Sequence, residues 1–146
     1  MKNKIVIALV LLGSLSISAQ KKVTWEDLAK VSFIDKYYKD YGQSFLFPVF
    51  SESVKNIEGQ KITISGYFLS LDPSGAVYML SKGPMAACFF CGIGGPETAM
   101  ELQFKETPEF ETDDIITVTG VLKLNKDDVE HFNYILQDVQ AKKGDD

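Results

Sequence analysis

Two long alternating segments, each interrupted by a single glycine, constrain the fold of this chain more than any other feature. Apolar side chains recur at every second position in residues 61–68 and 116–124, which is the period of a half-buried β-strand. Gly66 and Gly120 occupy interior positions of these segments. Because a glycine inside a strand often marks the sharp bend at a barrel corner, the sequence predicts a small closed β-barrel.

Three shorter segments have the same strand-like character, at residues 76–80, 100–104 and 132–139. Five strands with a long first strand match the OB-fold, a five-stranded barrel. A small β-sandwich is the alternative, because periodicity does not distinguish a closed barrel from two stacked sheets. The predicted fold class is therefore mainly β, with an OB-like barrel over residues 61–140 and a flexible charged tail at 141–146.

Residues 20–60 are predicted to form an N-terminal helix and an aromatic segment. Thr24 precedes Trp25-Glu26-Asp27-Leu28, so its hydroxyl can cap a short helix that extends to about Val31. The aromatic side chains between Phe33 and Phe50 follow no sustained period, and we interpret them as a wrap or strand laid over the core. Ser51 is then expected to begin a second short helix, which gives one or two short helices in all.

Residues 1–19 have the layout of a secretory signal peptide. Lys2 and Lys4 precede an apolar run, and small residues lead to a cleavage point after Ala19. A membrane-spanning helix needs about 20 apolar residues, and the run from Ile5 is shorter than that. The expected product is exported, periplasmic or secreted, with no membrane span after cleavage.

The charge of the chain argues against nucleic acid as a partner. All 15 basic residues are lysines, against 20 acidic residues, and loss of the two leader lysines gives 13 − 20 = −7. OB-folds that bind single strands combine stacking aromatics with a basic groove. The stacking residues could be Tyr67, Phe68, Tyr78 and Tyr134. The basic groove is missing, so the expected partner is an unknown protein or small ligand.

The two cysteines, Cys88 and Cys91, lie in one glycine-rich segment and are the main candidates for chemistry. In an oxidising compartment, two thiols at this spacing can form a structural disulfide. They can also supply two ligands of a metal site, with His131 as a third and zinc or copper as the ion. Other possible donors are Glu97, Asp127 and Asp128 for zinc, and Met79, Met85 and Met100 for Cu(I).

Dithiol redox catalysis is the third interpretation of the cysteine pair. It requires a thiolate stabilised by a helix N-terminus or a nearby cation. The segment instead leads into Gly92-Ile93-Gly94-Gly95-Pro96, and no lysine lies between Gly83 and Phe104. With a single histidine and no nucleophile elbow, the sequence predicts no catalytic residues.

The segment Cys88-Phe89-Phe90-Cys91-Gly92 resembles a block found in an uncharacterised family of small secreted bacterial proteins with an OB-like domain. In that family a Trp-x-x-Leu helix and a Gly-Tyr strand end precede the block, and the matching residues here are Trp25, Leu28, Gly66 and Tyr67. The resemblance implies the fold and export, and it brings no activity with it.

Together these features predict an exported, non-catalytic binding module. Its Cys-x-x-Cys loop is then a structural disulfide or a zinc or copper site. The alternative is a thiol-disulfide oxidoreductase or metallochaperone of the cell envelope that uses the same two thiols.

Overall fold

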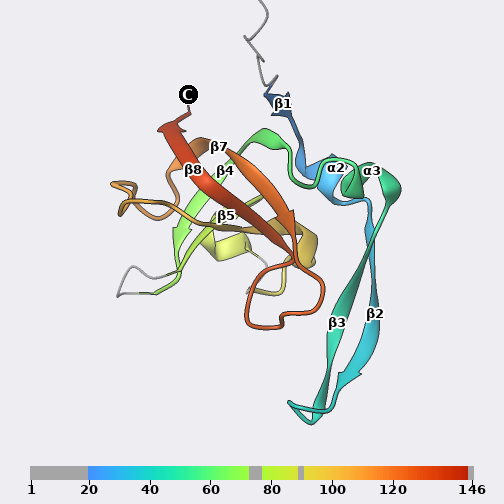
Figure 1. Cartoon of the computed structure of the whole chain (residues 1–146). Coiled ribbons are helices and arrows are strands. Elements are labelled where there is room, and N and C mark those ends of the chain that lie inside the picture. Colours follow the sequence, from blue (N-terminus) through green and yellow to red (C-terminus); the bar gives the residue numbers. More distant parts are fainter. Residues whose placement is uncertain (1–19, 73–76, 89–90, 145–146) are drawn as a thin grey trace, which may run out of the picture.

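A computed structural model describes residues 20–72, 77–88 and 91–144, and the predicted signal peptide at 1–19 lies outside the described residues. The main sheet has the order β1-β4-β5-β6-β8-β7, and an additional β4–β7 pairing closes it (Figure 1). Its strands are β1 (Lys21–Lys22), β4 (Lys61–Ser70), β5 (Tyr78–Ser81), β6 (Ala99–Leu102), β7 (Ile115–Leu124) and β8 (Tyr134–Lys143). Five strands, β4 to β8, form the barrel, and β1 adds a parallel strand beside β4. The prediction of a mainly β, OB-like barrel is confirmed.

Both strand glycines lie where two parts of the barrel backbone approach each other closely. A Cβ atom on Gly66 would lie 2.6 Å from the carbonyl oxygen of Ser81. A Cβ atom on Gly120 would lie 2.5 Å from the carbonyl oxygen of Gln137, beside a shift in the β7–β8 register. Only a residue without a side chain fits these positions, because a Cβ atom would overlap with backbone carbonyl oxygens.

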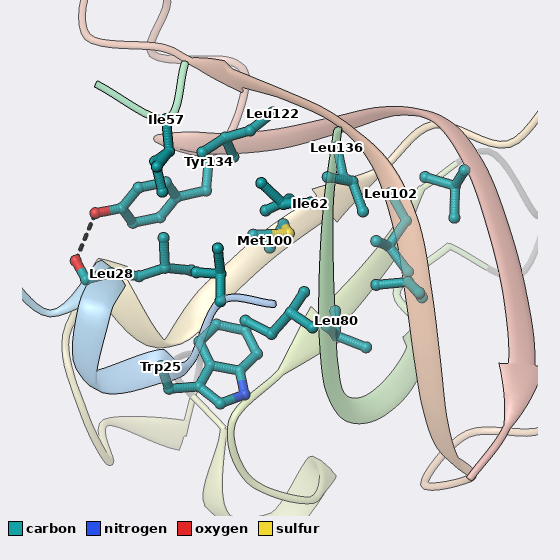
Figure 2. Packing of buried hydrophobic residues seen from close by; sticks show 14 of the residues in the cluster. Trp25, Leu28, Ile57, Ile62, Leu80, Met100, Leu102, Leu122, Tyr134 and Leu136 are labelled. Carbon is teal, nitrogen blue, oxygen red and sulfur yellow. Dashed lines mark hydrogen bonds between the residues drawn. The ribbon is translucent and has the colours of Figure 1, made fainter. Parts of the chain in front are cut away.

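Inward-facing positions of the barrel strands form the main core, which includes Ile62, Ile64, Ile116, Val118, Leu122 and Leu136. The short helix α2 (Trp25–Leu28) adds Trp25 and Leu28 to this core (Figure 2). Two hydrogen bonds fix α2: the Trp25 indole donates to the Ser65 carbonyl at 2.9 Å, and the Tyr134 hydroxyl donates to the Leu28 carbonyl at 2.6 Å.

The predicted cap of α2 is confirmed. The Thr24 hydroxyl accepts from the Asp27 backbone N–H, and the Asp27 carboxylate accepts from the Thr24 N–H, which forms a capping box. The helix ends at Leu28 rather than near Val31, because Val31 already begins strand β2. A second short helix, α3 (Glu52–Lys55), follows Ser51.

The aromatic segment forms an antiparallel hairpin, which we call the arm: β2 (Val31–Tyr38) and β3 (Gln43–Phe50). The arm is a separate two-stranded sheet that projects from the barrel end carrying α2 and α3 (Figure 1). This differs from the predicted wrap over the core. Only the base of the arm, where Phe50 is buried, contributes to the main core.

The face of the arm that is shielded changes along its length. Residues paired directly across an antiparallel ribbon share a face. The Val31–Phe50 pair is shielded at the base, whereas the Asp35–Leu46 pair of the same face is exposed. On the opposite face, the Lys36–Phe45 pair is partly buried. Two-stranded ribbons twist strongly, and this explains why the sequence shows no sustained period here.

Strand β8 continues to Lys143, so the predicted tail at 141–146 begins as part of the barrel rather than as a flexible segment. The last strand is extended because Lys143 pairs with Ile116 and its ammonium group lies 3.0 Å from the Asp114 carboxylate. Residues 145–146 are outside the described part of the chain. Within that part, no helix combines the length and the apolar character needed to cross a membrane.

Candidate functional site

A groove of ≈ 1010 Å³ lies between the arm and the barrel and is the main candidate binding site. Its lining comes from the arm near its tip, from the start of β5, from the end of β6 and from the loop between β7 and β8. The lining residues are Tyr38, 44–46, Leu71, Val77, Tyr78, Pro96, 101–107, Lys126 and 128–133. Residues 73–76 are not described. The volume is at the upper end of the range for ligand pockets in proteins.

The loop between β7 and β8 is held in shape by the buried side chain of Asn125. Its amide nitrogen donates to the carbonyl oxygens of Asp128, His131 and Phe132, at 2.7, 3.2 and 3.2 Å. Its oxygen accepts from the Asp128 N–H at 3.1 Å. These bonds fix the loop before any ligand arrives, so this wall of the groove is preorganised.

The arm contacts this same loop near its tip. The Lys36 ammonium lies 3.2 Å from the Asp127 carboxylate, and the Tyr38 hydroxyl donates to the Lys126 carbonyl at 3.3 Å. The same ammonium lies 4.2 Å from the centroid of the Phe47 ring. The arm is therefore attached at both its base and its tip, and the groove lies beside the attachment near the tip.

Aromatic rings form much of the apolar part of the groove. Tyr78 and Phe104 meet edge to face at 5.8 Å, and Tyr78 stacks on Phe68 of the core at 5.6 Å. On the arm, Tyr38 and Phe45 make a similar edge contact at 5.7 Å. Rings on opposite sides of the groove can both contact a bound aromatic or apolar group.

Of the four aromatic residues that the sequence suggested as a stacking surface, only Tyr78 lines the groove. Phe68 and Tyr134 are buried in the main core and present no ring to a ligand. The Tyr134 hydroxyl is bonded to Leu28, and burial raises the pKa of this phenol.

The charge of the lining is negative. Its carboxylates are Glu101, Glu106, Asp128 and Glu130, and its ammonium groups are Lys105 and Lys126. With His131 neutral, these give 2 − 4 = −2. Such a groove repels anions and attracts cations.

His131 lies in the groove, where its Nδ1 is 2.8 Å from a carboxylate oxygen of Glu101. The Glu101 side chain is 12% exposed, and the His131 side chain is 47% exposed. The hydrogen bond to Glu101, and then the attraction of that charge, raise the pKa of His131. The predicted ligand His131 is thus engaged with a carboxylate on the wall of the groove.

Cys88 is buried in a second, smaller core with Leu69, Met79 and Ala99. Three partly buried side chains pack against this second core: Leu71, Met85 and Phe132. Two of them, Leu71 and Phe132, also line the groove. The cysteine segment therefore lies directly behind one wall of the candidate binding site.

Cys91 is exposed, and its sulfur lies 3.8 Å from that of Cys88, so the two cysteines are close but not bonded. The Cys91 thiol donates to the Met85 carbonyl at 3.1 Å. The hydrogen bond with Cys88, and then desolvation, raise the pKa of Cys91. A raised pKa lowers the thiolate fraction at neutral pH, which is the opposite of what a redox catalyst requires.

The structure brings together two of the three proposed metal ligands. Among the described residues, no group of three or more His, Cys, Asp and Glu side chains could hold a metal ion. Of the methionines, Met79 and Met85 pack with Cys88, while Met100 belongs to the main core. A zinc or copper site that includes Cys88, Cys91 and His131 stays a prediction.

Sequence reasoning identified the cysteine segment and missed the groove. Four segments far apart in the chain line it together with Pro96, and none of these segments carries a recognisable motif. Comparison with protein-family models gave no match, and comparisons with curated proteins and with solved structures gave no significant match either.

Proposed function

We propose that the protein is an exported, non-catalytic binding module whose ligand occupies the groove between the arm and the barrel. The observation that carries this proposal is the position of the groove. It lies over β5, β6 and the loop between β7 and β8, which correspond to the second and third strands and the last connecting loop of an OB barrel. OB-folds bind oligonucleotides and oligosaccharides on that face.

The lining favours a peptide that carries both aromatic and basic side chains. Tyr78 and Phe104 offer ring faces and edges, while Asp128 and Glu130 can attract a lysine or arginine side chain. The net charge of −2 disfavours phosphates and other polyanions. An aromatic, basic peptide segment satisfies both parts of the lining at once.

The geometry around His131 supports binding rather than hydrolysis. A hydrolytic base needs a hydroxyl or thiol nucleophile within hydrogen-bond reach. The His131 ring nitrogen is instead bonded to the Glu101 carboxylate, and the same carboxylate accepts from the Phe132 N–H at 3.4 Å. The His131–Glu101 pair, together with the Phe132 N–H, therefore fixes part of the groove wall.

The test is an NMR titration of the ¹⁵N-labelled mature protein with two peptides, Lys-Tyr-Tyr-Lys and Glu-Tyr-Tyr-Glu. The basic peptide should shift amide signals of the groove lining, and the acidic peptide should bind more weakly by about tenfold. The double variant Glu106→Gln/Glu130→Gln should reduce this difference. Glu109→Gln, which removes an exposed carboxylate outside the lining, should preserve it.

Equal binding of both peptides, or shifts confined to residues outside the groove, would overturn the proposed ligand class. Binding of a neutral oligosaccharide such as cellotetraose, with neither peptide bound, would also contradict it. Export is tested separately: protein recovered from the envelope of a Gram-negative host should begin at Gln20.

A further inference from the structure

We propose that Cys88 and Cys91 form a reversible disulfide. Cys91 reacts first with an external disulfide, and Cys88 is the resolving thiol. The two sulfurs differ sharply in access to reagents. Cys88 is 1% exposed within the second core, and Cys91 is exposed at the surface. An external disulfide can therefore reach only Cys91, whereas Cys91 and Cys88 already face each other at 3.8 Å.

The reaction uses a low-molecular-weight disulfide as its oxidant, and glutathione disulfide is the probe. Cys91 loses its proton to solvent, and its thiolate attacks one sulfur of the probe, so that one glutathione leaves as a thiol. Cys88 then loses its proton and attacks the Cys91 sulfur of the mixed disulfide, which releases the second glutathione. Two protein thiols are oxidised to one disulfide, and one glutathione disulfide is reduced to two glutathione molecules.

The surroundings of Cys91 set the rate and the structural cost of this step. Its thiol must give up the hydrogen bond to the Met85 carbonyl before it can react. Met85 is itself fixed by its N–H, which donates to the Asp113 carboxylate at 2.6 Å. Closure brings the sulfurs from 3.8 Å to about 2.0 Å, the length of a disulfide bond. We therefore expect slow oxidation that accelerates as pH rises, unlike the fast exchange of a redox catalyst.

The test compares the wild type with Cys88→Ala and Cys91→Ala by intact mass after exposure to glutathione disulfide and an acid quench. The wild type should lose the mass of two hydrogen atoms without accumulating an adduct. Cys88→Ala should accumulate one glutathione adduct, because no resolving thiol remains. Cys91→Ala should react about tenfold or more slowly, because its remaining thiol is buried.

A second measurement separates burial from intrinsic reactivity. In urea, both single variants should acquire one adduct at similar rates, because both thiols are then exposed. Equal reaction of the two folded variants would overturn the proposal, as would a wild type that keeps a stable adduct or keeps both thiols. A circular dichroism spectrum of each variant, matched to the wild type, shows that the comparison is made on folded protein.

Discussion

The barrel and the arm are both built from antiparallel strand pairs but are stabilised in different ways. Every barrel strand has a neighbour on both sides, and its inward side chains are buried. The arm has two free edges, and five of its large apolar side chains are exposed: Ile34, Tyr37, Tyr41, Leu46 and Val49. An isolated two-stranded hairpin is marginal in water, so the arm depends on its attachments at base and tip. The barrel therefore supplies stability, while the arm supplies surface for the groove.

The largest contrast should come from one substitution made in each region. Leu136→Ala removes a fully buried side chain of barrel strand β8 from the main core and should lower the free energy of unfolding by about 3 kcal/mol. Leu46→Ala removes an exposed side chain of the arm and should cost less than about 0.5 kcal/mol. Urea denaturation measures both. Similar losses would contradict the division between a stabilising barrel and a dispensable arm surface.

A second contrast uses one glycine from each region. Gly120→Ala would place a methyl group against the Gln137 carbonyl, and we expect a loss of about 2 kcal/mol or more. Gly42→Ala meets nothing within 4 Å and is disfavoured only by its φ of 65°, at a cost of about 1 kcal/mol. Thermal unfolding compares the two variants. If Gly42→Ala proved the more harmful, close packing at the barrel bend would not be the reason for Gly120.

Two tyrosines provide a smaller contrast. Tyr134→Phe removes the hydroxyl that donates to Leu28 and leaves a buried carbonyl without this partner, which should cost about 1 to 2 kcal/mol. Tyr37→Phe changes an exposed arm residue and should be nearly neutral. The measurement is again urea denaturation. A neutral Tyr134→Phe would show that the hydrogen bond from Tyr134 to Leu28 adds nothing to the attachment of α2.

The smallest effect concerns the groove itself and depends on pH. Because the pKa of His131 is raised in the folded state, its ion pair with Glu101 contributes fully below the ordinary value of 6.5 and is lost as pH rises through the folded pKa. The half-exposed imidazole limits this contribution to a few tenths of a kcal/mol. His131 is the only histidine, so NMR can follow its titration alone. Glu101→Gln should lower that pKa towards 6.5, and an unchanged value would contradict the pairing.

The fold was largely predictable because the barrel strands obey a simple physical rule. Ile62 and Ile64 in β4, and Ile116 and Val118 in β7, are buried at alternate positions as their period requires. Gly66 indicated closure, and in the structure the Ser81 carbonyl oxygen approaches it so closely that no side chain fits. Strand β1 could not be predicted, because Lys21 and Lys22 are exposed and carry no apolar pattern.

The arm and the groove could not be predicted, and the reason is also physical. Because the arm twists, one of its faces is shielded at the base and the opposite face is shielded near the tip. Val31 and Lys36 are therefore partly buried on opposite faces, and the apolar residues follow no single period. The groove arises only when Tyr38 of the arm meets the loop that begins at Lys126, and this contact depends on tertiary structure. The closeness of Cys88 and Cys91, in contrast, follows directly from their spacing in sequence.

Leu71 and Phe132 both pack against the second core, which contains Cys88, and both also line the groove. Well-packed interiors are nearly incompressible, so a displacement on one side of such a wall is transmitted to the other. A ligand that displaces Phe132 would thereby change the packing of the second core, which contains the sulfur of Cys88. Occupancy of the groove and the oxidation state of the cysteines would then be mechanically linked through the side chains that the groove and the second core share.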